Sequence, residues 1–167
     1  TLGKERGAKD WFELAEIRKK NMNRYLWDEQ AGLFFDYNVR TGERREYPFA
    51  TTYFPLWTGW ATPAQAAQLS GNTELFARPG GVVTSTHRSG NQWDSPFGWA
   101  PLQMVAVEGL ARYGYEREAR TFARNFLSLV RQEYEKSGTI VEKYDVVNRT
   151  SDVSADIDYG YSSNEIG

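Results

Sequence analysis

The residues with the clearest chemical potential lie in one ten-residue segment, 92–101. This segment places two indole rings, Trp93 and Trp99, close to the amide of Gln92 and the carboxylate of Asp94. The flat C–H faces of sugars stack on indole rings, and amide and carboxylate groups bind sugar hydroxyls. Two prolines and a glycine in the same segment force an irregular loop that a helix can follow. The residue types therefore predict a carbohydrate-binding loop, although an aspartate in a turn also caps backbone groups.

A second chemical candidate is the carboxylate of Glu142, which follows Gln92 by fifty residues (142 − 92 = 50). It lies beside apolar Ile140 and Val141 and directly precedes Lys143. Surroundings of this kind can tune a carboxyl group for acid–base work. On residue types alone, a surface glutamate beside a lysine is the alternative interpretation.

The other polar residues are weaker candidates for a functional site. Arg88 is a candidate partner for a ligand hydroxyl or carboxylate, or a surface residue. His87 is the only histidine, so it supports no metal cluster. The acidic residues of 152–165 lack the spacing of a calcium-binding loop. We therefore expect neither a metal nor a cofactor.

The composition is that of one modest domain of 167 residues with a net charge of −2. The absence of cysteine excludes disulfides and thiolate metal sites. Charges of both signs are spread along the chain, so we expect no nucleic-acid partner. No window approaches about 18 apolar residues, so we expect no membrane span. Aromatic residues make up 15% of the chain, which fits carbohydrate binding or a core rich in rings.

The elements that must position these residues are mainly helical. Apolar residues at spacings of three and four predict helices over 10–26, 48–61, 63–69, 101–113 and 116–135. A short strand or hairpin is expected at 33–37 with a turn at 41–42, and a short extended piece at 82–86. From Glu142 onward the residue types predict a loop. Short connections alternate with long ones, which is typical of stacked helical hairpins whose long loops build the functional face.

At this point the sequence resembles a known family, the trehalases, which hydrolyse α,α-trehalose on an (α/α)6 barrel. Residues 92–101, QWDSPFGWAP, resemble the family signature QWDxPxGWAP. Residues 141–146, VEKYDV, resemble a second family segment, and Pro79-Gly80-Gly81 is similar to the family's approach to the signature. The resemblance covers roughly residues 20 to 147.

The resemblance implies an all-α fold, part of an (α/α)6 barrel or toroid with short hairpins and long functional loops. Residues 1–167 would be the C-terminal part of a single catalytic domain. It implies inverting hydrolysis of a small disaccharide by two carboxyl groups about 6.5–9.5 Å apart. Glu142 matches the family's general base. The substrate-binding candidates are Gln92, Trp93, Asp94, Trp99 and Arg88.

The sequence departs from the family pattern after residue 147. Residues 148–167 lack the family's glycine-rich stretch, whose glutamate contacts substrate, and Glu165 is the candidate for that glutamate. The family's general acid belongs to a motif that we expect upstream of Thr1, so the 167 residues alone should be inactive. Apolar helix faces at the cut edges should then be covered by the remaining barrel or by a second copy.

Two alternatives stay open at this stage. One is another (α/α)6 α-glucosidase that acts on glucose-terminated oligosaccharides, and the other is a non-catalytic sugar-binding fragment. A chain that starts at Thr1 rather than Met is expected to be processed or a fragment. A periplasmic or secreted location fits the resemblance, but no signal segment distinguishes it from the cytoplasm.

Overall fold

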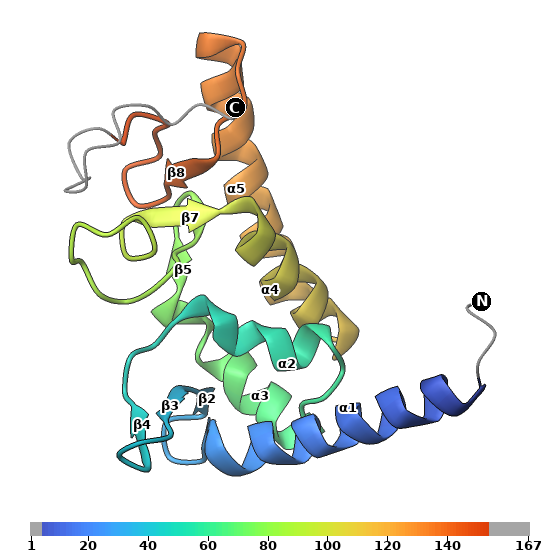
Figure 1. Cartoon of the computed structure of the whole chain (residues 1–167). Helices are drawn as coiled ribbons and strands as arrows, with labels where there is room; N and C mark the ends of the chain where they lie inside the picture. Colours follow the sequence, from blue (N-terminus) through green and yellow to red (C-terminus); the bar gives the residue numbers. More distant parts are fainter. Residues whose placement is uncertain (1–4, 154–167) are drawn as a thin grey trace.

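A computed structural model of the chain describes residues 5–153. Helices dominate, and short antiparallel strands connect them (Figure 1). In chain order the elements are α1 (Glu5–Tyr25), β1 (Trp27–Asp28), β2 (Leu33–Phe34), β3 (Asp36–Asn38), β4 (Glu43–Arg45), the 3-10 turn η1 (Ala50–Tyr53), α2 (Phe54–Trp57), α3 (Pro63–Gly71), the 3-10 turn η2 (Thr73–Leu75), β5 (Ala77–Arg78), β6 (Gly81–Val82), β7 (Phe97–Trp99), α4 (Ala100–Arg112), α5 (Glu116–Ser137) and β8 (Lys143–Asp145).

The helical hairpin α4–α5 is the largest packing unit of the fold. The two helices are joined by a short turn at Gly114, whose φ of +84° suits glycine. Both helices bury apolar side chains, and these are Leu102, Val105, Ala106, Leu110, Ala119, Phe122, Phe126 and Leu129. On the other side, α2 crosses α4 closely at Gly109. A Cβ there would lie 3.0 Å from both Leu56 Cβ and Trp57 N, which is tighter than an ordinary van der Waals contact, so glycine favours this approach.

Tyr53 lies at the centre of the core between helices. Its ring makes edge contacts with Phe76 and Phe122, with centroids 5.6 and 6.1 Å apart. Among the described residues, its hydroxyl has no hydrogen-bond partner, although the residue is fully buried. Burial raises the pKa of Tyr53 far above its usual value. A buried polar group without a partner lowers stability.

The predicted helices at 63–69, 101–113 and 116–135 are confirmed as α3, α4 and α5. Local signals set the start of α3: Thr62 accepts a hydrogen bond from the backbone of Gln65, and the Gln65 side chain accepts one from Thr62 N. This reciprocal arrangement satisfies two donors at the helix start. Gly138, with φ +71°, ends α5 in the left-handed conformation.

Three sequence-based expectations need correction. The long helix predicted over 48–61 is only η1 and α2, because Phe49 is extended and forms a bridge with Ser85. The first helix begins at Glu5 rather than near residue 10. The segment after Glu142 is not all loop, because Lys143–Asp145 forms β8 and pairs with β7.

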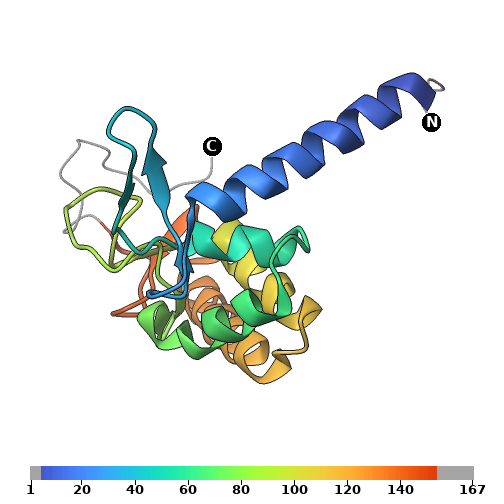
Figure 2. The same ribbon diagram turned by 90° about the horizontal axis from the view of Figure 1, so that it is seen from below.

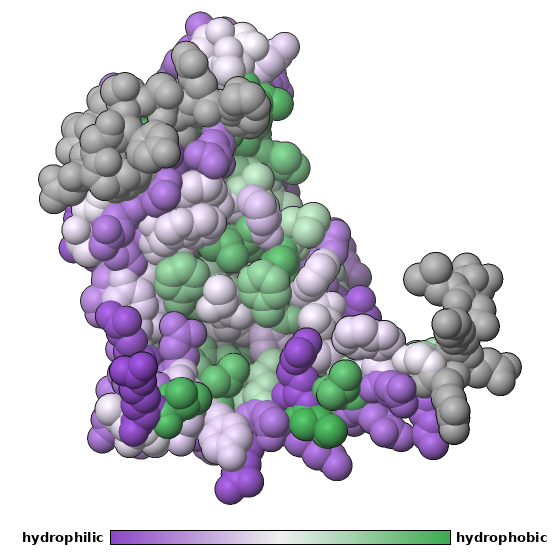
Figure 3. Space-filling model, in the orientation of Figure 1, coloured by the Kyte–Doolittle hydropathy of each residue, from purple (hydrophilic) through white to green (hydrophobic). Residues whose placement is uncertain are grey.

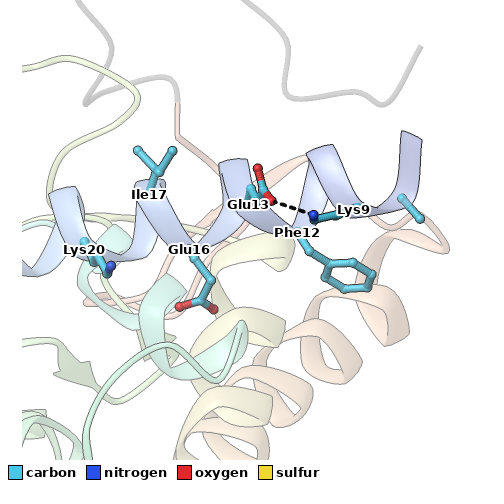
Figure 4. A pocket seen from close by; sticks show the side chains of 7 residues that line it. Lys9, Phe12, Glu13, Glu16, Ile17 and Lys20 are labelled. Atoms are coloured by element: carbon cyan, nitrogen blue, oxygen red, sulfur yellow. Dashed lines mark ion pairs between the residues drawn. The ribbon is translucent and has the colours of Figure 1, made fainter. Parts of the chain in front are cut away.

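Helix α1 extends away from the rest of the described chain (Figure 2). Trp11, Phe12, Leu14 and Ile17 are all more than half exposed on it. Figure 3 shows apolar side chains both along α1 and around α2 and α4. The hollow along α1 is lined by residues of that helix alone, and Figure 4 shows Phe12 and Ile17 pointing away from different sides of it. It therefore brings together no groups from separate elements. No helix within residues 5–153 is long and apolar enough to cross a membrane.

Candidate active site

Pairing of β7 with β8 brings the two chemically promising segments together. The register sets Phe97 opposite Asp145, Gly98 opposite Tyr144 and Trp99 opposite Lys143. All of α4 and α5 lies between the two strands in sequence (Figure 1). A Cβ on Gly98 would lie 2.5 Å from Val146 Cγ1 and 2.7 Å from the Val82 carbonyl oxygen. The glycine of the segment is therefore required for this close pairing.

The two indole rings of segment 92–101 stack on each other. The ring centroids of Trp93 and Trp99 are 4.1 Å apart with an interplanar angle of 6°. Trp99 is buried, and its Nε1 donates to the carbonyl of Gln92 at 2.9 Å. Trp93 is 46% exposed. Trp99 thus supports Trp93 from behind, and one face of Trp93 remains open.

Glu142 directly precedes β8, whose first residue, Lys143, pairs with Trp99. The Glu142 side chain is 54% exposed, and its Oε2 lies 3.8 Å from Nζ of Lys143. The Lys143 side chain is buried, with Nζ 5.4 Å from the centre of the Trp99 ring. Of the two apolar neighbours of Glu142, Ile140 is exposed, whereas Val141 is partly buried and packs against the core. A line of contacts therefore runs from Glu142 through Lys143 to Trp99.

Asp94 has a different environment from Glu142. It is 5% exposed, and its carboxylate accepts hydrogen bonds from the hydroxyls of Tyr47, Ser89 and Ser85, the last at 2.7 Å. Burial raises the pKa of Asp94, but these three hydroxyl donors outweigh it and hold the pKa below its usual value. The ionised carboxylate therefore fixes the loop, and its role toward a ligand stays a prediction.

Tyr47 joins this loop to the segment after β4. Its ring stacks on His87 with centroids 3.9 Å apart and an angle of 11°. Burial and the hydrogen bond to Asp94 raise the pKa of the Tyr47 hydroxyl. Sequence reasoning did not single out Tyr47, because no local pattern links it to a loop forty residues later.

A cavity of about 450 Å³ lies between these elements. It is lined by Asp36, Arg45, Tyr47, Phe49, Asn91, Gln92, Trp93 and Asp94. Three of the predicted site residues, Gln92, Trp93 and Asp94, therefore share one cavity. Trp99 and Glu142 do not line it, although Trp99 contacts Trp93. Arg88 is exposed and outside the lining, and Glu165 lies outside the described residues.

The turn that follows β8 is fastened to α5 by polar side chains. Asp145 is buried and accepts hydrogen bonds from the backbone of Val147 and Asn148. Glu133 of α5, also buried, accepts from both the backbone N and the hydroxyl of Ser151, at 2.9 and 2.7 Å. These contacts anchor the far end of β8, and sequence reasoning missed both carboxylates.

No group of three or more histidine, cysteine, aspartate or glutamate side chains within residues 5–153 is arranged to hold a metal ion. The cavity instead combines an open indole face with carboxylate, amide, phenol and guanidinium groups. Such a mixture suits a small, hydroxyl-rich ligand.

Comparison with known proteins identifies clear relatives. The family model described as Trehalase matches residues 1–164. A cytosolic neutral trehalase from Kluyveromyces lactis is 40% identical over 166 residues, which are 93% of this chain and 22% of that protein. A periplasmic trehalase from Escherichia coli O1:K1 / APEC is 38% identical over 146 residues, 87% of this chain and 26% of that protein. The chain thus spans about a quarter of the length of these relatives.

Solved structures agree with the sequence relatives. The neutral trehalase Nth1 from Saccharomyces cerevisiae matches with a TM-score of 0.75 and 40% identity, over 82% of this chain and 26% of that one. A GH63 mannosylglycerate hydrolase from Thermus thermophilus, in complex with glucose, matches with a TM-score of 0.65 over 75% of this chain and 32% of that one. Its identity of 23% establishes a shared fold alone.

Proposed function

This chain belongs to the trehalase family, and from that membership we propose that the complete protein carrying it hydrolyses α,α-trehalose to two molecules of glucose. Its fold is that of part of an (α/α)6 barrel, as the resemblance implied. The observation that carries the proposal is the β7–β8 pairing, which sets Glu142 beside the tryptophan-bearing segment. The exposed carboxylate directly precedes β8, and the open indole of Trp93 stacks on Trp99, the last residue of β7.

In the proposed mechanism, Glu142 is the general base. Its exposed carboxylate can hold a water molecule and take a proton from it as the water oxygen attacks the anomeric carbon. The bond from that carbon to the glycosidic oxygen breaks, and a carboxylic acid gives the departing glucose its proton. Attack from the face opposite the leaving group inverts the anomeric carbon, which requires the carboxyl groups to be about 6.5–9.5 Å apart. We assign the general acid to a residue of the complete protein that lies outside residues 1–167.

The other predicted residues have supporting roles in this proposal. Trp93 offers its open face to a glucosyl ring, and Trp99 holds Trp93 from behind. Gln92 lines the cavity with its amide. Asp94 fixes the loop through three hydroxyl donors, so its substitution should disturb the loop before it disturbs a ligand contact. Arg88 and Glu165 stay candidate substrate contacts.

Replacing the carboxylate of Glu142 tests this assignment. In the complete protein, Glu142→Gln should lower kcat for trehalose by about three orders of magnitude or more, because the attacking water loses its base. The circular dichroism spectrum should not change, since the side chain is exposed. Glu135→Gln is a matched control, because Glu135 is an exposed carboxylate on α5 paired with Arg131.

Azide gives the same experiment a second readout. The azide anion needs no deprotonation, so it should restore turnover of Glu142→Gln and form β-glucosyl azide, detectable by NMR. Wild-type hydrolysis should release one glucose as the β-anomer first. Near-normal kcat in Glu142→Gln would remove this residue from the role of base, and an α-configured first product from the attacked ring would remove the inverting mechanism.

A further inference from the structure

One wall of the 450 Å³ cavity comes from a hairpin that the proposed mechanism does not use. Strands β3 and β4 pair antiparallel, with Asp36 directly opposite Arg45. Both residues line the cavity together with Gln92 and Trp93. The hairpin therefore brings an acidic and a basic side chain to the same space as the open indole face.

Neither charged group is committed to a partner within residues 5–153. No hydrogen bond or ion pair engages the Asp36 carboxylate or the Arg45 guanidinium there, and Arg45 only lies over the ring of Tyr47 at 5.2 Å. The adjacent Arg44 differs, because it donates to the Tyr25 carbonyl at 2.9 Å and lies 3.4 Å from the Asp28 carboxylate. Arg44 thus fastens the hairpin, and Arg45 remains available to a ligand.

The chemistry of the pair matches adjacent hydroxyl groups. A carboxylate only accepts hydrogen bonds, and a guanidinium only donates them from a rigid planar fork. Two neighbouring sugar hydroxyls can donate to the first and accept from the second at once. Because Trp99 covers one face of Trp93, a sugar ring has a single face of that indole on which to stack. The volume lies within the range of about 300–1,000 Å³ found for small-ligand pockets.

We propose that Asp36 and Arg45 are specificity-determining residues that bind neighbouring hydroxyls of a glucosyl unit stacked on the open face of Trp93. The proposal rests on the proposed hydrolysis of trehalose and names the residues that recognise the substrate of that reaction. The pair selects for the arrangement of hydroxyls on the sugar ring and takes no part in proton transfer.

Deletion of single hydroxyls from the substrate tests this wall directly. In the complete protein, Arg45→Ala should lower kcat/KM for trehalose by about 10- to 100-fold, mainly through KM, because a charged hydrogen bond is lost. At least one monodeoxy-trehalose should suffer a similar loss with the wild-type protein. Arg45→Ala should then show no further loss on that same analogue, and Asp36→Asn should show the same coupling to the neighbouring hydroxyl.

Arg40→Ala is the matched control, because Arg40 is an exposed arginine in the turn of the same hairpin and is not part of the cavity lining. Its kcat/KM should stay within about twofold of wild type. Equal losses of kcat/KM in Arg40→Ala and Arg45→Ala would overturn the proposed role of Asp36 and Arg45. The absence of coupling to any deoxy analogue would overturn it as well. Trehalose binding, followed by indole fluorescence, separates the two proposals. If Kd shows the coupling between each substitution and its deoxy analogue but there is no turnover, binding of hydroxyls by Asp36 and Arg45 is supported and hydrolysis of trehalose is contradicted. If turnover is normal and no coupling is seen, only the role of Asp36 and Arg45 is contradicted.

Discussion

Glu133 shows how a single buried carboxylate can hold the turn after β8 in place. Burial raises its pKa, but hydrogen bonds from Lys136, Ser151 and Gln132 outweigh that effect and bring the pKa to about 2. A folded pKa below the usual 4.5 means that ionised Glu133 stabilises the fold. This stabilisation is complete above about pH 4.5 and is lost as the pH falls toward 2, and it amounts to roughly 2–3 kcal/mol.

We therefore expect acid sensitivity that depends on Glu133. Urea unfolding of the complete protein should show the free energy of unfolding falling between about pH 4.5 and 2, and Glu133→Gln should flatten that fall. The variant should also be less stable than wild type at neutral pH, because Ser151 loses a charged acceptor. Glu116→Gln, at an exposed ion pair, is the control and should keep the wild-type slope. An equal fall in the Glu133 variant would contradict the assignment.

The buried hydroxyl of Tyr53 leads to a prediction of the opposite sign. Because this group has no partner within residues 5–153, removing it should relieve a desolvation cost. We expect Tyr53→Phe to leave the free energy of unfolding unchanged or to raise it by up to about 1 kcal/mol. Chemical denaturation measures this change, and a loss above about 1 kcal/mol would mean that the hydroxyl makes a favourable contact.

Among the elements, the β7–β8 pair depends most on one residue. Gly98→Ala would place a methyl group against Val146 Cγ1 and the Val82 carbonyl. We expect a loss of about 1–3 kcal/mol in stability. A shift of β8 by about 1 Å can also lower kcat about 100-fold. Kinetics and unfolding of the variant measure both effects.

Gly71→Ala is the control for this substitution. Gly71 ends α3, and a Cβ there would meet no atom within 4 Å. Its stability should stay within about 0.5 kcal/mol of wild type or rise, because the unfolded chain loses freedom. Wild-type kinetics in Gly98→Ala would show that the β7–β8 spacing does not position Glu142.

The elements also show what the sequence can and cannot predict. Helices α3, α4 and α5 were predicted because their apolar spacing and end signals are local. Strand β8 was missed because it contains Lys143 and Asp145, whose burial depends on the distant ring of Trp99 and on its own following turn. For the same reason, only three of the eight cavity residues were predicted. Of the five others, Asn91 directly precedes Gln92 in the same loop, whereas Asp36, Arg45, Tyr47 and Phe49 reach the cavity through tertiary packing, which no local pattern encodes.

At the scale of the whole molecule, the chain carries one half of the proposed catalytic pair. If residues 1–167 are expressed alone, we expect no detectable release of glucose from trehalose, because the proposed acid lies elsewhere. The Glu142→Gln form of residues 1–167, expressed and purified in the same way, measures contamination and gives the background. Turnover by residues 1–167 above that background would show that the acid is within this chain.

The long separation between β7 and β8 also sets an order of events during synthesis. The hairpin α4–α5 is built from contacts close in sequence and can form as soon as Ser137 has been made. The β7–β8 ladder closes around that whole hairpin, and its anchor at Ser151 comes later still. A nascent chain that stops before this residue can therefore contain a folded α4–α5 hairpin and still lack the arrangement around Glu142. Premature termination or proteolysis near residue 150 should thus abolish catalysis before it abolishes helical structure.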